Sequence, residues 1–207
     1  MRRLFPTQTM DARGPYDLLT RLVVPRPIAW VSTVSPSGVA NLAPHSFFTV
    51  ASQHPPVVQF TSVGRKDTLT NIEATGEFVV NLAPESMLEE VNGSSAPFPA
   101  GVGEFEALGI APEASERVAP PRVAGSPAAL ECRLHRVVEV GDCFLVLGEV
   151  VCFAIDEAVL DADRPDRPRP MMTRMRPLAR LGGAEWGLVG EVVSVLRPTS
   201  PEQARRA

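Results

Sequence analysis

Residues 62–68, with the sequence SVGRKDT, bring two cations and several hydroxyl groups to the expected start of a short helix. A helix N-terminus offers unpaired backbone N–H groups and about half a positive charge. With Arg65, Lys66 and the hydroxyl groups of Ser62 and Thr68, such a start could cradle a phosphomonoester. The alternative is an ordinary solvated loop whose cations face water.

A second loop, residues 44–48 (PHSFF), places polar and aromatic side chains between two apolar strands. Flat heteroaromatic ligands are typically held by apolar contacts and by a few backbone and hydroxyl hydrogen bonds. Ser46, Phe47 and Phe48 offer such a set, and His45 could donate a hydrogen bond or gate the site. The alternative is that the two phenylalanines belong to the core and His45 to the surface.

Other chemical motifs receive less support. Cys132 and His135 have a spacing typical of a metal pair, but positions i and i+3 of a strand point to opposite faces, so we expect no metal site. The sequence contains no GxGxxG, GxxxxGK[ST] or GxSxG motif, which argues against the usual dinucleotide, P-loop and hydrolase sites. No side chain is assigned as a catalytic acid or base.

Composition limits the class of protein further. A net charge of −4 and a pI of about 5.5 provide no basic field for nucleic acid or anionic membrane. Lys66 is the only lysine. The three cysteines lie in apolar runs, so we expect no disulfide framework and a reducing cytoplasmic location. No segment approaches the length of a membrane span.

The pattern of apolar residues predicts about seven strands and three short helices. Residues 143–155 are apolar at positions that face both sides of a strand, which favours a central strand. Another strand is expected from Ala129, where apolar and polar residues begin to alternate. Asp67 is expected as the N-cap of a helix over residues 68–75, with Gly76 at its C-terminal end. Further strands are expected at residues 28–34, 39–42, 47–51, 57–61, 77–82 and 191–196, and further helices at residues 16–24 and 84–92. Without βαβ alternation, this order favours a mainly β protein, an antiparallel barrel or sandwich.

The chain length of 207 residues fits one domain. We expect that domain at residues 16–198, with flexible termini at residues 1–15 and 199–207. Residues 94–127 are rich in proline and glycine, and such a long excursion is usually a functional cover, an extension over a partner subunit, or a mobile segment.

Four blocks together resemble the flavin reductase-like family of FMN-binding split-barrel proteins. These blocks are PRPIAWVSTVSPSGVANLAPHSFFTVASQHPPVV, GRKDTLTNI, GEFVVNL and RLGGAEW, in that order, and the resemblance covers residues 16–198. It implies an antiparallel split β-barrel of Greek-key type that forms a homodimer, with one FMN per subunit near the interface. It also implies that Ser46, Phe47 and Phe48 line the isoalloxazine ring and that His45 makes its outer face more polar. The residues that would surround the phosphate and ribityl end, or support the flavin loop, are Ser62, Arg65, Lys66, Asp67, Thr68 and Asn81.

The activity that the resemblance implies is hydride transfer from NADH or NADPH to N5 of the flavin, which supplies the redox chemistry. Reduced flavin would then serve a partner monooxygenase or another electron acceptor. One alternative is an FMN-binding electron carrier or binding module without nicotinamide activity. Another is a structural split barrel that has lost the flavin.

Overall fold

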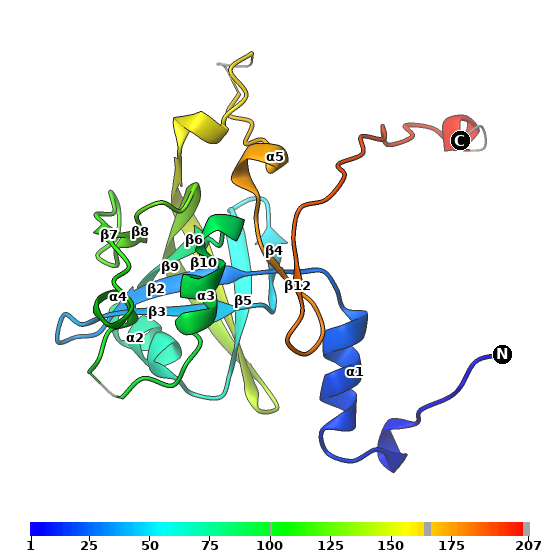
Figure 1. Cartoon of the computed structure of the whole chain (residues 1–207), viewed down its shortest axis with the longest axis horizontal. Coiled ribbons are helices and arrows are strands. Elements are labelled where there is room, and N and C mark those ends of the chain that lie inside the picture. The colour runs from blue at the N-terminus through cyan, green and yellow to red at the C-terminus, as the bar shows by residue number, and fades with distance from the viewer. Residues whose placement is uncertain (100, 164–166, 205–207) are drawn as a thin grey trace.

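The computed structural model describes residues 1–99, 101–163 and 167–204 and is built on a seven-stranded antiparallel sheet (Figure 1). The order of the strands is β3-β2-β6-β9-β10-β5-β4. Their bounds are β2 (Ala29–Val34), β3 (Ala40–His45), β4 (Phe48–Ser52), β5 (Val57–Val63), β6 (Glu77–Leu82), β9 (Ala128–Val140) and β10 (Cys143–Ile155). The expectation of a mainly β, antiparallel protein is confirmed.

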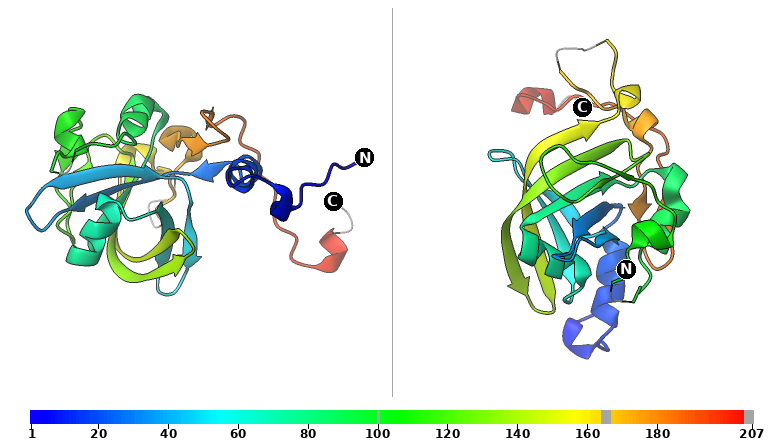
Figure 2. Two further views of the ribbon diagram at one scale, coloured as in Figure 1. Left: turned by 90° about the horizontal axis from the view of Figure 1, so that it is seen from below. Right: turned by 90° about the vertical axis from the view of Figure 1, so that its left-hand side faces the viewer.

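The two edge strands of this sheet are consecutive in the chain. Only Ser46 and Phe47 separate the end of β3 from the start of β4. The sheet curls until its two edge strands meet at these two residues (Figure 2). Phe47 itself continues the pairing of β4 with β5, since the Thr61 N–H group donates to the Phe47 carbonyl oxygen over 2.9 Å. The curved sheet is therefore bridged into a barrel at the loop that the sequence singles out.

Strand β2 separates two apolar cores because its residues alternate between the two faces of the sheet. Ala29 and Val31 belong to the core inside the barrel with Phe60 and Phe78. Trp30 belongs to a second core on the other face. This explains why residues 28–31 are apolar at every position. Inside the barrel the packing is close, because a Cβ atom at Gly148 of β10 would overlap the Phe78 ring.

The chain also forms short helices. They are η1 (Thr7–Thr9), α1 (Gly14–Leu22), α2 (Asp67–Thr75), η2 (Glu85–Met87), α3 (Leu88–Gly93), α4 (Glu104–Ala107), η3 (Glu157–Val159), α5 (Met172–Met175) and α6 (Pro201–Ala204). Of these, η1 and α6 lie away from the barrel near the two chain ends (Figure 1). The single helix expected at residues 84–92 is divided into η2 and α3. The division falls at Met87, whose backbone angles (φ −119°, ψ 29°) are not helical.

The N-terminus of α2 differs from the prediction. Lys66, in an extended conformation, precedes the helix, and Asp67 is its first residue without a side-chain capping hydrogen bond. The predicted capping role of Asp67 is therefore wrong, although its carboxylate remains in the first turn, where the helix dipole favours negative charge. The predicted end is confirmed: Gly76 adopts φ 74° and donates its N–H to the Ile72 carbonyl oxygen over 2.8 Å.

The last expected strand, at residues 191–196, is not present in the structure. The chain forms β1 (Arg26–Pro27), β11 (Ala179–Arg180) and β12 (Trp186–Gly187) in a small separate sheet. After β12 it leaves the barrel (Figure 1), so no strand lies beside this segment to pair with its backbone. Val193 and Leu196 are 75% and 91% exposed.

The proline- and glycine-rich excursion is anchored to the barrel. It contains α4 and a short pair of strands, β7 (Pro112–Glu113) and β8 (Arg122–Val123). Phe105 and Val123 are buried in the second apolar core. In addition, the Val123 N–H group donates to the side-chain oxygen of Asn81 over 2.8 Å. The excursion is thus fixed at several points along its length.

No helix among the described residues is long and apolar enough to cross a membrane. Across the same residues there is no group of three or more His, Cys, Asp or Glu side chains arranged to hold a metal ion.

Candidate functional site

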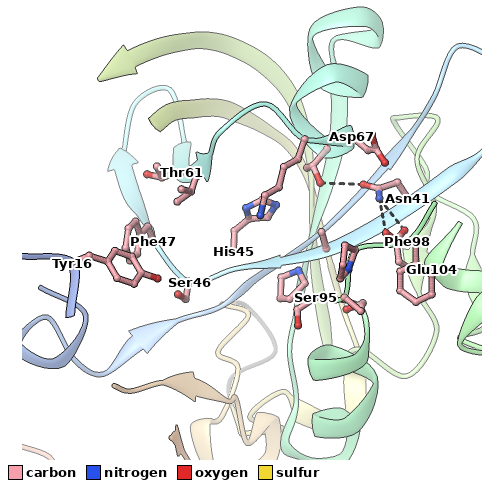
Figure 3. A pocket seen from close by; sticks show the side chains of 18 residues that line it. Tyr16, Asn41, His45, Ser46, Phe47, Thr61, Asp67, Ser95, Phe98 and Glu104 are labelled. Carbon is pink, nitrogen blue, oxygen red and sulfur yellow. Dashed lines mark hydrogen bonds between the residues drawn. The ribbon is translucent and has the colours of Figure 1, made fainter. Parts of the chain in front are cut away.

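One cavity of about 440 Å³ joins the two loops that the sequence singles out (Figure 3). Tyr16 and Phe47 lie at one end of it, which we call the aromatic end. The other end is polar and contains Asn41 and Glu104, with the Phe98 ring beside them. The described lining residues are Tyr16, Asn41, Ala43, Pro44, His45, Ser46, Phe47, Thr61, Val63, Lys66, Asp67, Thr68, Ser94, Ser95, Ala96, Pro97, Phe98 and Glu104. The two loops therefore belong to one site.

The aromatic end is formed where the barrel is bridged. Ser46 and Phe47 line the cavity at the break between β3 and β4. Phe48, by contrast, does not line it: this residue begins β4, pairs with Phe60 on β5, and packs against the core inside the barrel. Phe47 and Phe48 point in different directions because successive side chains of an extended chain point to opposite faces.

His45 lies between the two ends of the cavity (Figure 3) and is only 8% exposed. Its ring packs on Phe60, with 4.6 Å between the ring centroids. Burial is the main cause that lowers the pKa of His45 to about 4. A backbone hydrogen bond with Thr61 raises this pKa, and the charge of Lys66 lowers it. Its Nε2 atom is buried without a hydrogen-bond partner in the described part of the chain. His45 is thus a neutral imidazole with one polar atom unused.

The start of α2 brings one cation, Lys66, and one carboxylate, Asp67, to the site. Lys66, Asp67 and Thr68 line the cavity, and Lys66 is the only cationic side chain among the described lining residues. No acidic side chain in residues 1–99, 101–163 or 167–204 forms an ion pair with it. The first N–H group of α2 with a backbone partner is that of Thr70, so the preceding N–H groups are free to bind a ligand.

Besides Phe48, three predicted site residues are placed outside the cavity lining. Arg65 forms two hydrogen bonds with Glu73 and stacks on the Phe144 ring at 4.9 Å, outside the cavity. The Ser62 hydroxyl donates to the Gly64 carbonyl oxygen over 2.9 Å and shapes the turn before α2. Asn81 is fully buried and donates to the Trp30 carbonyl oxygen over 3.0 Å. Its side-chain oxygen also accepts the hydrogen bond from Val123, so Asn81 joins β6 to the excursion. Strand β6 is two positions away in the sheet from β3, which leads into the cavity-lining loop. Their role in ligand binding stays a prediction.

The polar end contains a network that the sequence does not reveal. The Glu104 carboxylate accepts hydrogen bonds from Asn41 Nδ2 at 2.9 Å and from the Leu42 N–H group at 2.8 Å. The side-chain oxygen of Asn41 in turn accepts a hydrogen bond from the Thr68 hydroxyl at 3.1 Å. Burial raises the pKa of Glu104, an effect that its hydrogen bonds oppose and that the nearby Asp67 carboxylate reinforces. This network ties α4, β3 and α2 together at the cavity wall.

The excursion and α1 also contribute lining residues that the sequence does not identify. Residues 94–98 follow α3 and form one side of the cavity. They are held there by the indole N–H of Trp30, which donates to Ser94 Oγ over 2.9 Å. Tyr16 reaches the aromatic end from α1. The composition of residues 94–127 marks the segment as unusual, but no local signal identifies these contacts.

Comparisons with known proteins agree with this architecture. The family model for the flavin reductase like domain matches residues 20–177. The solved structure of nitrilotriacetate monooxygenase component B from Bacillus cereus is 31% identical, with a TM-score of 0.85, over 94% of this chain and 98% of that one. The 2-nitrobenzoate 2-nitroreductase NbaA from Pseudomonas fluorescens is 29% identical, with a TM-score of 0.87, over 95% and 97%.

A split-barrel-domain protein from Shewanella frigidimarina shares the fold at 20% identity, with a TM-score of 0.83, over 92% of this chain and 96% of that one. Its split barrel corresponds to the bridged seven-stranded sheet described here. The family match spans most of the chain and includes both loops that form the cavity. The chain therefore belongs to the flavin reductase-like family and has its split-barrel fold.

Proposed function

We propose that this protein binds FMN in the cavity and acts as an NAD(P)H-dependent flavin oxidoreductase. The observation that carries the proposal is the joining of two loops into one cavity with an aromatic end and a single cationic side chain among its described lining residues. A flavin nucleotide has the matching chemistry, because a flat apolar ring is connected to a phosphate. A volume of about 440 Å³ lies within the usual range for small-molecule sites.

The residues present fit such a ligand at several points. Phe47 and Tyr16 offer apolar surface to a ring, and the Ser46 hydroxyl lies beside them. The unpaired Nε2 atom of His45 offers one hydrogen bond to a polar edge of that ring. At the other end, Lys66 and the free N–H groups of α2 suit a phosphate. When bound, the flavin supplies the electron-transfer chemistry.

The roles of the chain's own residues are binding, orientation and exclusion of water. The wall of residues 94–98, held through Ser94, covers one side of the cavity. The Asn41–Glu104 network fixes β3 against α4, so the polar wall is held rigid. Rigid walls keep a bound ring at a constant distance from a second substrate, which favours electron transfer over side reactions.

A partner monooxygenase is the proposed recipient of the reduced flavin. Support comes from the similarity along nearly the whole chain to the component B protein of nitrilotriacetate monooxygenase. The nitroreductase likeness supports an alternative in which an electron acceptor is reduced directly at the site. Adding candidate acceptors to the reduced protein under anaerobic conditions distinguishes the two, since a direct acceptor reoxidises it without a second protein.

The direct test of cofactor binding is a titration of purified protein with FMN. We expect a yellow complex with a visible absorbance band and quenched flavin fluorescence. A protein that stays colourless and leaves the fluorescence of added FMN unchanged would contradict the proposal. Riboflavin and FAD in parallel titrations show which flavin the cavity prefers, and we expect FMN to bind most tightly.

We also propose that the protein forms a homodimer. Helix α1 and the segment after β12 both extend beyond the barrel on one side (Figures 1 and 2). Large apolar side chains of both are exposed in the single chain, and they are Tyr16, Leu19, Leu22, Val23, Leu188, Val192, Val193, Val195 and Leu196. A monomer rarely exposes so many large apolar side chains in two neighbouring extensions of the chain. Because Tyr16 also lines the cavity, a second copy seated on α1 would reach the cavity entrance.

Leu22→Glu should therefore weaken the dimer. Leu22 is 75% exposed in the single chain, so glutamate costs little there but must be desolvated if a second copy covers it. Light scattering should give twice the 22.3 kDa chain mass for the wild type, and a mass closer to that of one chain for the variant at low concentration. A monomeric wild-type protein, or a variant that dimerises equally well, would rule out this surface.

A further inference from the structure

Arg26 is a buried cation directly behind the aromatic end of the cavity. It belongs to β1 and is 7% exposed, although it does not line the cavity itself. Its Nε–H group points to Ser46 Oγ at 3.5 Å, and its guanidinium carbon lies 5.9 Å from the centroid of the Phe47 ring. Arg26 thus contacts both residues that bridge β3 and β4.

The other hydrogen bonds of Arg26 fix its position. Nη1 donates to the Thr20 carbonyl oxygen and, over 2.9 Å, to that of Val23, at the C-terminal end of α1. Nη2 donates to the Leu181 carbonyl oxygen over 2.7 Å. Three segments distant in sequence therefore meet at one guanidinium group. Such a planar fork, with four of its five N–H donors in hydrogen bonds, holds its geometry better than a lysine would.

The charge of Arg26 is not balanced by a carboxylate. In the part of the chain that the structure describes, Arg26 forms no ion pair, and its hydrogen-bond acceptors are three carbonyl oxygens and a hydroxyl. Burial accordingly lowers its pKa, although guanidinium groups stay protonated in proteins. Tyr16 raises the pKa of Arg26 and the nearby Arg180 cation lowers it further. A buried positive charge without a carboxylate partner projects its field into the neighbouring cavity.

The hydrogen-bonding direction at Ser46 follows from the chemistry of arginine. A guanidinium has donors and no acceptor, so Ser46 Oγ must accept from it. The Ser46 hydroxyl proton is then left to donate elsewhere, and the cavity is the open direction, because Ser46 lines it. Arg26 therefore both holds Ser46 and selects its role as a hydrogen-bond donor to a ligand.

We propose that Arg26 is a positioning residue that, through Ser46 and through its own charge, makes the cavity prefer the reduced, negatively charged flavin over the oxidised form. This inference rests on the proposed flavin binding. It concerns the ring end of the site and is independent of the phosphate contacts of Lys66. An electron-rich ring gains more from a donated hydrogen bond and from a nearby positive charge than a neutral ring does.

The test compares Arg26→Gln, Arg26→Lys, Ser46→Ala and the double variant Arg26→Gln/Ser46→Ala. For each, the dissociation constants of oxidised and dithionite-reduced FMN are measured anaerobically. Arg26→Gln should weaken the reduced complex about tenfold more than the oxidised one. By linkage, this lowers the two-electron midpoint potential of bound FMN by about 30 mV. Arg26→Lys keeps a cation and should recover part of that difference, which general loosening of the fold would not do.

The double variant shows whether Arg26 acts through Ser46. We expect the loss in the double variant to be smaller than the product of the two single losses, because removing either partner breaks the same contact. An unchanged ratio of the two dissociation constants in Arg26→Gln, or fully multiplicative losses, would overturn the proposal. If Arg26→Gln does not fold, the same cycle with Arg26→Lys decides the coupling. Wild-type protein that binds no FMN would instead refute the proposed function.

Discussion

Lys66→Ala is expected to weaken FMN binding by about fivefold to 150-fold, the loss of a charge-assisted hydrogen bond worth roughly 1–3 kcal/mol. Lys66 is the only cation among the described lining residues, and it precedes the free N–H groups of α2. The residue is exposed and packs into no core, so the folded state should keep its stability. Flavin fluorescence titration measures the dissociation constant, and thermal unfolding checks the fold.

Two controls make the Lys66 result specific. Arg65→Ala removes the neighbouring cation, whose guanidinium is paired with Glu73 outside the cavity, and should change FMN affinity less than about twofold. Riboflavin lacks the phosphate, so Lys66→Ala should bind it as the wild type does. Equal losses for FMN and riboflavin, or a larger effect of Arg65→Ala, would place the phosphate elsewhere.

Acidification below pH 6.5 should destabilise the protein through His45. Its pKa is lowered by burial from 6.5 to about 4 in the folded state, so the folded state excludes a proton that the unfolded chain accepts. The contribution of His45 is fully present above pH 6.5 and is lost progressively as the pH falls towards 4. A shift of this size corresponds to about 3 kcal/mol in the free energy of unfolding.

His45→Phe isolates this contribution, because phenylalanine keeps an aromatic ring against Phe60 and cannot take up a proton. Urea unfolding at pH 7.5, 5.5 and 4.5 should show a smaller loss of stability in the variant than in the wild type. His135→Gln, at an exposed position, is the matched control and should follow the wild-type curve. Parallel curves for wild type and His45→Phe would show that His45 is not the buried neutral group described here.

Much of the barrel could be predicted because its patterns are local. The bounds of β6 and β10 agree with the predicted ranges, since each is a mainly apolar segment between turn signals. The end of α2 at Gly76 follows from backbone geometry that glycine adopts readily. The strand expected at residues 191–196 has a strand-like sequence too, but pairing depends on a neighbour that the single chain does not provide there.

The candidate site could be predicted only in part because its walls come from distant segments. His45, Ser46, Phe47 and Lys66 lie in two loops near one another in sequence, and the structure brings them together. Glu104 reaches Asn41 across 63 positions, and no local pattern encodes that contact. Greek-key connectivity, the domain bounds and the ligand-binding roles of the predicted residues stay predictions.

Arg65 shows a different limit of sequence reasoning. It is adjacent to Lys66 and carries the same charge, yet Glu73 on α2 and the Phe144 ring hold it outside the cavity. Two neighbouring cations thus have different surroundings because their side chains leave the backbone in different directions. Charge and spacing alone could not separate them.

The measurement that tests the central claim most directly is the anaerobic reduction of the FMN-loaded protein by NADH and by NADPH. The account predicts that the visible flavin band bleaches with at least one of them, faster than for free FMN at the same concentration. A protein that binds FMN but is bleached only by dithionite would contradict the proposed NAD(P)H-dependent activity and would indicate an electron carrier instead.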